Sequence, residues 1–312
     1  MVKRGLGDEY DDVSILPVKA RAYLDLTKPA SSIGVAGAFF LASLFYFEYT
    51  GSVIVGNLRD IIFASVTIAL AHSASQALNM AEDSEMDAQT PHKQDRPIPA
   101  GIVTTEEART LAWFLILAAI GRAYLTRGMF GIFITVLVVF GIFYNLNPIR
   151  AKERVISIPW QATSRGLLLF PAVWSAYGDP FTPLPWVFGV FMFWYVLSYQ
   201  NSADIADREV DAEYNINTFI VLFGIKRTGY IATVGTLLMI VTILLAVYLS
   251  LVPGYFIWLL AVLPLCVTML YYMIVKHEEV SDATGNSPAW LVYYAGFILI
   301  TSIPVSIEYF VL

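Results

Sequence analysis

Residues 61–87 read IIFASVTIALAHSASQALNMAEDSEMD, and this stretch decides the class of fold. Its first part is apolar for about the twenty residues that a helix needs to cross the hydrocarbon core of a bilayer. Its second part places Glu82, Asp83, Glu85 and Asp87 at the end of that segment. We therefore expect a membrane-spanning helix that ends in a group of carboxylates.

The composition of the whole chain agrees with a membrane protein. Of its 312 residues, 57% are hydrophobic and 14% are charged, with a mean hydropathy of +0.65, whereas a soluble domain carries about 25% charged residues. The single cysteine, Cys266, excludes an intrachain disulfide. We expect the lipid bilayer, and no nucleic acid, among the partners of this chain.

The start of the chain does not have the features of a secretory signal. Residues 1–20 lack a continuous apolar core and a small-residue cleavage site. We expect them to form a cytoplasmic lead-in with little regular structure.

Apolar segments recur along the chain and predict an all-α integral membrane protein, a bundle of nine transmembrane helices. The predicted spans are 30–48, 58–80, 108–126, 129–146, 158–178, 184–203, 228–251, 254–275 and 289–311. The loops after the odd-numbered spans are short, whereas those after the second, fourth and sixth spans are longer and charged. We expect the charged loops to form a cytoplasmic cap over a central cavity.

Lysine and arginine predict the orientation in the membrane. The N-terminal segment and the loops after the even-numbered spans hold 15 of the 19 basic residues, and cytoplasmic loops collect such residues. We expect the N-terminus and the charged loops in the cytoplasm. An odd number of spans then places the C-terminus outside.

Two acidic stretches lie at the predicted cytoplasmic ends of the second and sixth spans. The second stretch, residues 199–224, reads YQNSADIADREVDAEYNINTFIVLFG. The side chains of interest are Asn79, Asp83 and Asp87 in the first stretch and Asp204, Asp207 and Asp211 in the second. Their spacings are i, i+4, i+8 and i, i+3, i+7, so each set would share one face of a continuing helix. The prolines from Pro91 onward end the first helix.

Crowded carboxylates at a membrane edge indicate a cation. They repel each other unless a positive charge lies between them, and hard oxygen ligands favour Mg²⁺, which commonly joins a few carboxylates to substrate phosphates. Two facing acidic helix ends therefore predict a site for a metal–diphosphate. The alternative for either stretch alone is a solvated helix end that happens to be acidic.

The loop after the fourth span offers cations for such a diphosphate. The segment FYNLNPIRAKERV contains Arg150, Lys152 and Arg154 on the same predicted side of the membrane as the acidic stretches. Arginine binds phosphate through two parallel hydrogen bonds, and lysine acts as a point charge. Topology alone is the alternative explanation, because every cytoplasmic loop collects basic residues.

These segments resemble the UbiA superfamily of intramembrane prenyltransferases. The first acidic stretch is similar to the family motif N-D-x-x-D-x-x-x-D and is followed by DRPIPAG, and the second is similar to D-x-x-D-x-x-x-D. YNLNPIRAKER is similar to the tyrosine–basic segment between them. The resemblance covers nearly the whole chain and implies a single transmembrane domain, residues 21–312.

The resemblance implies a Mg²⁺-dependent transfer of an isoprenyl group from an allylic diphosphate to an aromatic, quinone-type or lipid-alcohol acceptor. It implies two Mg²⁺ ions, bridged by the diphosphate and held by Asn79, Asp83, Asp87, Asp204, Asp207 and Asp211, the five aspartates being the catalytic set. It implies diphosphate binding by Lys28, Tyr144, Arg150 and Lys152, with Arg154 as the alternative to Lys152.

Two positions depart from the family pattern. Met80 stands where the first motif usually has a second acidic residue, which some members such as chlorophyll synthases also lack. In NTFIVLFG, Asn217 and Ile220 replace the lysine and proline of K-T-x-P-V-x-x-G. One basic contact to the diphosphate is therefore missing there, and Arg208 is the candidate to replace it.

Polar residues near the first motif are candidates for contact with the acceptor. His72 and Gln76 share the helical face of Asn79 and Asp83. For His72 we favour the alternative, a hydrogen bond to a neighbouring helix.

Further candidates lie in the fifth and sixth spans. Gln200 and Asn201 stand one turn before Asp204. We expect them either to contact a substrate or to form hydrogen bonds between two helices. Arg165 lies inside the fifth span, and a buried charge there normally faces a polar cavity or a partner. We expect it to hold an anionic acceptor, with a purely structural pair to a carboxylate as the alternative.

Other functions fit parts of this pattern. A UbiA-type terpene cyclase would use the same diphosphate site without an acceptor. A membrane CDP-alcohol phosphotransferase would carry D-G-x-x-A-R followed by G-x-x-x-D-x-x-x-D, which the sequence lacks. A transporter would place its ionisable groups near the membrane midplane, whereas the acidic groups here cluster at one predicted face.

Overall fold

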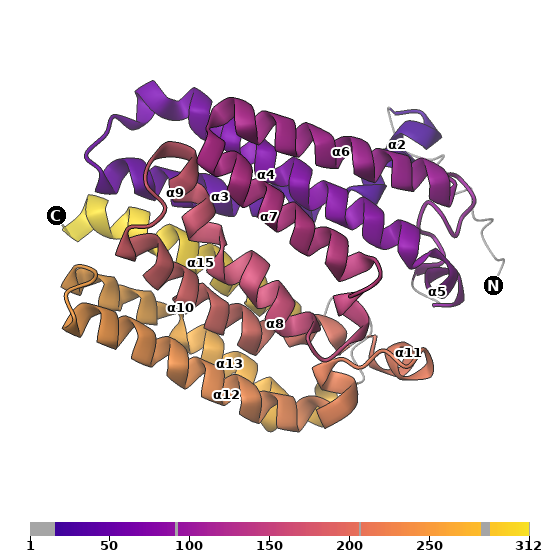
Figure 1. Ribbon diagram of the computed structural model, residues 1–312. Helices are drawn as coiled ribbons and strands as arrows, with labels where there is room; N and C mark the ends of the chain where they lie inside the picture. Colours follow the sequence, from indigo (N-terminus) through magenta and orange to yellow (C-terminus); the bar gives the residue numbers. More distant parts are fainter. Residues whose placement is uncertain (1–15, 91–92, 206, 282–287, 312) are drawn as a thin grey trace.

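The computed structural model describes residues 16–90, 93–205, 207–281 and 288–311. Every regular element in these ranges is helical, which confirms the predicted all-α class. The long helices lie lengthwise beside one another in a bundle (Figure 1). The described part of the chain contains six helical segments long and apolar enough to cross a membrane: α3 (Pro29–Tyr49), α4 (Ile54–Glu82), α6 (Thr105–Thr126), α7 (Gly128–Asn145), α12 (Phe219–Tyr248) and η5–α13 (Gly254–Ile274).

The other three predicted spans coincide with helical segments outside these six. Span 158–178 corresponds to α8 (Ser157–Gln161), η3 (Ala162–Leu167) and α9 (Leu169–Tyr177), span 184–203 to α10 (Pro183–Tyr199), and span 289–311 to α15 (Pro288–Val311). The count of nine membrane crossings therefore stays a prediction.

Short helices gather at one end of the bundle, where Figure 1 shows α2, α5 and α11 together. They are α2 (Val18–Leu26), α5 (Ser84–Gln89), η2 (Ala151–Glu153), η4 (Gln200–Asp204), α11 (Arg208–Glu213) and α14 (His277–Ser281). Of the predicted lead-in, residues 1–15 lie outside the described ranges, and α2 begins before residue 20. We call this end, with α5 and α11, the acidic end.

Local sequence explains two of the long helices that lead away from the acidic end. α6 starts at a capping box, in which the Thr104 hydroxyl accepts from the Glu107 N–H at 3.2 Å and the Glu107 carboxylate accepts from the Thr104 N–H at 2.8 Å. α12 starts earlier than the predicted residue 228, because Thr218 caps it through the Val221 N–H at 3.3 Å. Gly224, with φ +75°, then breaks the helical geometry inside α12.

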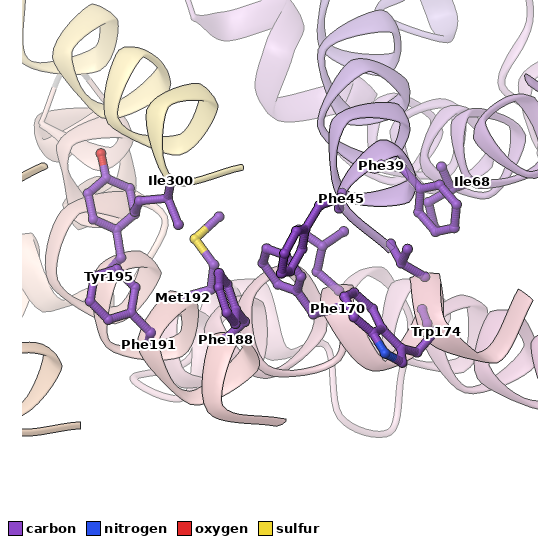
Figure 2. Close-up of a cluster of buried hydrophobic side chains, with 14 of the residues drawn as sticks. Phe39, Phe45, Ile68, Phe170, Trp174, Phe188, Phe191, Met192, Tyr195 and Ile300 are labelled. Carbon is purple, nitrogen blue, oxygen red and sulfur yellow. The ribbon is translucent and has the colours of Figure 1, made fainter. Parts of the chain in front are cut away.

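Aromatic side chains form much of the core (Figure 2). Phe45 packs with ring-centroid distances of 5.6 Å to Trp174, 5.4 Å to Phe188 and 5.7 Å to Phe256. Tilted and edge-on aromatic contacts at such distances add to the free energy gained by burial. The cluster joins α3, α9, α10 and η5, and the only cysteine, Cys266, is buried in it as a free thiol.

Candidate active site

Asp83 lies between α4 and α5, at the acidic end. Its N–H donates to the Asn79 carbonyl at 3.0 Å, and its own carbonyl accepts from the Asp87 N–H at 2.8 Å. The i, i+4, i+8 spacing therefore holds along the chain. The expectation that the prolines end the first helix was wrong, because α4 already ends at Glu82 and Asp83 adopts φ −101° and ψ 5°.

The second acidic stretch does not form one continuous helix, which corrects the expected single helical face. Asp204 ends the 3₁₀ segment η4, Asp207 precedes α11, and Asp211 lies within α11. The Asp211 N–H donates to the Asp207 carbonyl at 2.8 Å. Asp207 and Asp211 thus keep helical spacing, whereas Asp204 reaches the site from the end of α10.

The two acidic stretches meet through a lysine. Lys93 Nζ lies 2.9 Å from Asp207 Oδ1, and the Lys93 side chain is buried. Because Lys93 follows the first stretch in sequence, this ion pair brings Lys93 against Asp207, which immediately precedes α11. Both short helices lie at the same end of the bundle (Figure 1).

Cations also surround the first stretch. Lys152 Nζ lies 2.5 Å from Asp83 Oδ1, Arg150 Nη2 lies 3.8 Å from the same oxygen, and Arg96 Nη1 lies 2.6 Å from Asp87 Oδ2. Lys152 and Arg150 were predicted from the sequence, whereas Arg96 was not assigned a role. The sequence did contain an indication for Arg96, because this residue belongs to DRPIPAG, the segment that follows the first motif.

Asn145 connects these groups and was missed in the sequence. Its side-chain oxygen accepts from Asn79 Nδ2 at 3.1 Å and from Lys152 Nζ at 3.5 Å, and its Nδ2 donates to the Gly141 carbonyl at 2.9 Å. Asn79 Nδ2 also donates to Asp83 Oδ2 at 2.8 Å. The fully buried Asn145 amide therefore fixes the side chains of the first motif. In the sequence, only its neighbour Tyr144, a predicted site residue, pointed to this position.

Lys28 joins the same electrostatic group from the start of α3. Burial, together with the charges of Arg96, Lys93 and Arg165, lowers the pKa of its ammonium to about 8, while the Asp87 carboxylate opposes this shift.

Several oxygens of the site are buried and lack a hydrogen-bond partner in the described ranges. They are Asp87 Oδ1, Gln200 Oε1, Asn201 Oδ1 and Asp204 Oδ2. Carboxylate and amide oxygens are the ligands of Mg²⁺, and a buried unpaired oxygen is costly unless a cation or donor reaches it. The residues present therefore fit a hard divalent cation.

The acidic side chains do not form a closed ligand cluster. Within the ranges that the structure describes, no three Asp, Glu, His or Cys side chains are placed to hold one metal ion together. This arrangement suits Mg²⁺, which usually takes one or two carboxylates and completes its shell with water and substrate phosphates.

Mutual repulsion and burial disturb the acid–base properties of the second motif. Burial, followed by the Asp207 and Asp83 carboxylates, raises the pKa of Asp211 to about 7, although Lys93 lowers it. Burial and the charges of Asp211 and Asp207 raise the pKa of Asp204 well above its ordinary value.

These raised pKa values predict a pH-dependent stability. A carboxyl with a raised folded-state pKa binds its proton more tightly when folded, so it favours folding at low pH, and this contribution is lost as pH rises from the ordinary value of 3.8 through about 7. We expect a higher Tm at pH 6 than at pH 8 in EDTA, and Asp211→Asn to reduce the difference. Added Mg²⁺ should stabilise the protein more at pH 8, because its ligands must be deprotonated. Equal Tm values at both pH values in EDTA would contradict this.

Two predicted basic residues stay away from the carboxylates. Arg154 is exposed and donates to the Pro148 carbonyl at 3.1 Å, and Arg208 is exposed at the start of α11. Among the described residues, neither lies within ion-pair distance of an acidic side chain. Of Lys152 and Arg154, the two alternatives in the basic segment, only Lys152 forms an ion pair with Asp83 among the described residues.

A cavity of about 150 Å³ lies beside the acidic end and is lined by α3, α4, α7, the α8–η3–α9 segment and α15. Most of its lining is apolar or aromatic, for example Ile68, Leu137, Phe140, Trp160 and Phe297. Its polar lining residues are Ser31, His72, Ser75, Tyr144, Gln161, Ser164, Arg165, Tyr293 and Tyr294. Tyr144 lies within electrostatic range of Asp204 and Asp83, so the cavity adjoins both motifs.

His72 combines the two roles considered for it. Its Nε2 lies 2.9 Å from Ser31 Oγ on α3, as the favoured structural alternative predicts, and 3.2 Å from Gln76 Nε2. The ring also lines the cavity.

Gln200 and Asn201, in contrast, lie buried in η4, where Asn201 Nδ2 donates to the Leu197 carbonyl at 3.0 Å.

Known proteins are similar to this chain in sequence and in fold. A profile of the UbiA prenyltransferase family matches residues 33–303. The chain is 23% identical to digeranylgeranylglyceryl phosphate synthase of Sulfurisphaera tokodaii over 288 residues, 89% of this chain and 95% of that one. It is 26% identical to 4-hydroxybenzoate octaprenyltransferase of Vibrio cholerae over 66% of this chain and 71% of that one. A UbiA homolog from Archaeoglobus fulgidus, solved bound to GPP and Mg²⁺, shares the fold with a TM-score of 0.69 at 16% identity, covering 92% and 98% of the two chains.

Proposed function

Because the chain belongs to the UbiA prenyltransferase family, we propose that it uses Mg²⁺ to transfer the isoprenyl group of an allylic diphosphate to a hydrophobic acceptor. The observation that carries this proposal is the meeting of the two acidic motifs at one end of the bundle, beside an apolar cavity. The relatives named above act on prenyl substrates according to their names, and one homolog binds GPP with Mg²⁺.

The metal ligands in this proposal come from both motifs. Two Mg²⁺ ions would be held by Asn79, Asp83, Asp87, Asp204, Asp207 and Asp211, and the unpaired oxygens of Asp87 and Asp204 support this choice. When bound, Mg²⁺ neutralises the diphosphate and stabilises the charge that develops on it as a leaving group.

Basic side chains would bind the rest of the diphosphate. Lys152 and Arg150 lie at Asp83, Arg96 lies at Asp87, and Lys93 lies at Asp207, so each motif already has cations at its carboxylates. Arginine can bind phosphate through two parallel hydrogen bonds. We add Lys93 and Arg96 to the predicted diphosphate site, in place of the exposed Arg154 and Arg208, because their ion pairs place them at the motif carboxylates.

The cavity would hold the reacting end of the isoprenyl chain. Its apolar lining keeps water from an allylic cation, and the aromatic faces of Tyr144, Trp160, Tyr293 and Tyr294 can stabilise positive charge by cation–π attraction. Asp83 and Tyr144, within electrostatic range of each other, connect the diphosphate end with this aromatic lining.

In the membrane, we place the acidic end on the cytoplasmic side, as a cap over the cavity of a nine-helix bundle. The charged loops that favour this orientation are those at the acidic end. The last helix, α15, ends at the opposite end of the bundle (Figure 1), as an odd number of crossings requires.

The decisive experiment supplies purified protein in lipid nanodiscs with labelled geranyl, farnesyl or geranylgeranyl diphosphate, Mg²⁺, and lipid or quinone extracts. We expect a prenylated product, identified by mass, that disappears in EDTA. A cyclic hydrocarbon or alcohol formed without any acceptor would instead identify a terpene cyclase. Uptake into sealed vesicles without any product would favour a transporter.

A further inference from the structure

A second cavity, of about 390 Å³, lies at the end of the bundle opposite the acidic end. It is lined by residues of the last turns of α3, α6 and α9 and of the first turns of α4, where the chain has turned from α3 into α4 (Figure 1). The 29 residues of α4 correspond to about 43 Å, which exceeds the thickness of the hydrocarbon core of a bilayer. The second cavity therefore lies near the membrane surface opposite the diphosphate site.

Two opposite charges line the second cavity without pairing. Arg59 and Asp60 are neighbours in the first turns of α4, and both are exposed. Among the described residues, neither forms a hydrogen bond or an ion pair, with each other or with a third residue. A ligand that satisfies both side chains carries one negative and one positive group.

The surroundings of Asp60 suit an ammonium group. The rings of Phe47 and Tyr177 both line the second cavity, with their centroids 4.8 Å apart. Tyr177 also lies within electrostatic range of Asp60. Aromatic faces attract an ammonium by cation–π interaction, and a carboxylate accepts its charge-assisted hydrogen bonds.

The positive side of the second cavity suits a phosphate. The Arg122 guanidinium lies 3.7 Å from the ring centroid of Phe63, which lines the cavity, and donates to the Phe63 carbonyl at 3.3 Å. These contacts hold Arg122 against the cavity wall. Arg59, in contrast, donates to none of the described residues, so its guanidinium can bind a phosphate through two parallel hydrogen bonds.

An exposed apolar stripe continues from the second cavity along α4. Val55, Ile62 and Val66 stand at i−4, i+3 and i+7 from Arg59 and therefore share its helical face. They are 82%, 49% and 42% exposed. Leu125, in the cavity lining, is 84% exposed. A molecule whose polar part fills the cavity can thus lay apolar chains along this stripe.

We propose that the second cavity binds the headgroup of a zwitterionic phospholipid from the leaflet opposite the diphosphate site. Its phosphate contacts Arg59, its ammonium contacts Asp60 beside the two rings, and its acyl chains lie along the apolar stripe. The lining comes from α3, α4, α6 and α9, so the headgroup joins four helices and stabilises the bundle by binding its folded form. This inference does not depend on prenyl transfer.

The test compares three lipids that share the same acyl chains. Phosphatidylethanolamine carries both charges, phosphatidylglycerol carries only the phosphate, and a trimethylammonium lipid without phosphate carries only the positive charge. Native mass spectrometry of the purified full chain in detergent gives the Kd for each lipid, and thermal unfolding gives the Tm. We expect phosphatidylethanolamine to bind about tenfold more tightly than either other lipid, as expected for one additional charge-assisted contact. It should also raise the Tm most.

Variants assign the two charges to their side chains. Arg59→Gln and Asp60→Asn should each weaken the binding of phosphatidylethanolamine about tenfold, and Asp60→Asn should also abolish the preference for it over phosphatidylglycerol. Arg227→Gln is the matched control for the first, because Arg227 is an exposed arginine on α12, outside the second cavity. Asp179→Asn is the control for the second, because Asp179 is exposed two residues after Tyr177 but does not line the cavity. Both controls should bind the lipid as the wild-type protein does.

Three results would overturn the inference. The first is equal binding of the three lipids by the wild-type protein, a measurement that needs no variant. The second is an equal loss of lipid binding in Arg59→Gln and in Arg227→Gln. The third is binding of glycerophosphoethanolamine, the headgroup without acyl chains, as tightly as the intact lipid, which would assign the second cavity to a water-soluble ligand. None of these measurements uses prenyl transfer, so a failure here leaves the proposed function standing.

Discussion

Asp83→Ala is expected to lower kcat about a thousandfold, a loss of the size seen when a group that stabilises developing charge is removed. Asp83 accepts from Asn79 and lies 2.5 Å from Lys152. Its removal would take away a proposed Mg²⁺ ligand and also leave the buried Lys152 ammonium without its carboxylate. The measurement is kcat at saturating isoprenyl diphosphate and acceptor over a series of Mg²⁺ concentrations.

The chain offers a matched control for Asp83. Glu85 lies in the same acidic stretch but is exposed, so Glu85→Ala should keep kcat within about twofold, as is usual for a surface substitution. Size-exclusion chromatography of the Asp83→Ala protein in detergent checks that it still folds. Retained turnover that is insensitive to EDTA in this variant would refute the proposed metal site.

Asp204→Asn should separate catalysis from stability. Asp204 Oδ2 is buried without a hydrogen bond, and the charges of Asp211 and Asp207 oppose its ionisation. The amide keeps the shape but removes a charge whose burial is costly. We expect kcat to fall about 100- to 1000-fold, while the Tm in EDTA at pH 8 stays unchanged or rises.

Glu213→Gln is the corresponding control, because Glu213 is an exposed carboxylate on α11. It should leave both kcat and Tm unchanged. An Asp204→Asn protein whose Tm falls by several degrees together with its activity would assign a structural role to Asp204 instead.

Helical spacing was enough to predict the first motif. Asn79 and Asp83 lie where the i, i+4 pattern placed them, and His72 and Gln76 share their face, because backbone hydrogen bonds continue through the end of α4. Local spacing predicts such arrangements well, since the distances are set by the helix itself.

Contacts made by loops could not be read from the sequence in the same way. Lys93 and Arg96 reach Asp207 and Asp87 because the chain after α5 folds back over the site, and no periodicity encodes that path. Lys152 is buried and Arg154 exposed because they lie at different positions around one 3₁₀ turn. In the sequence the two were equivalent basic residues of one loop.

The fifth predicted span shows a second feature that the sequence could not predict, the local geometry of its helix. Its apolar residues predict a helix, and helices are present from Ser157 to Tyr177. Hydropathy does not report the π turn at Ala162–Leu167, because that turn depends on how closely the Gly166 backbone approaches α10. Only the unusual Arg165 indicated that this segment does more than cross the membrane.

Because of the π turn, the backbone geometry of the fifth segment depends on the number of its residues and not only on their type. Removing a single residue between Ala162 and Leu167 would let the turn return to ordinary α geometry, because a π turn holds one residue more than an α turn. Residues inside the turn, Arg165 among them, would then change their position around the helix axis, whereas the flanking helices would keep their alignment. A single-codon deletion there would therefore alter the lining of the cavity without replacing any side chain.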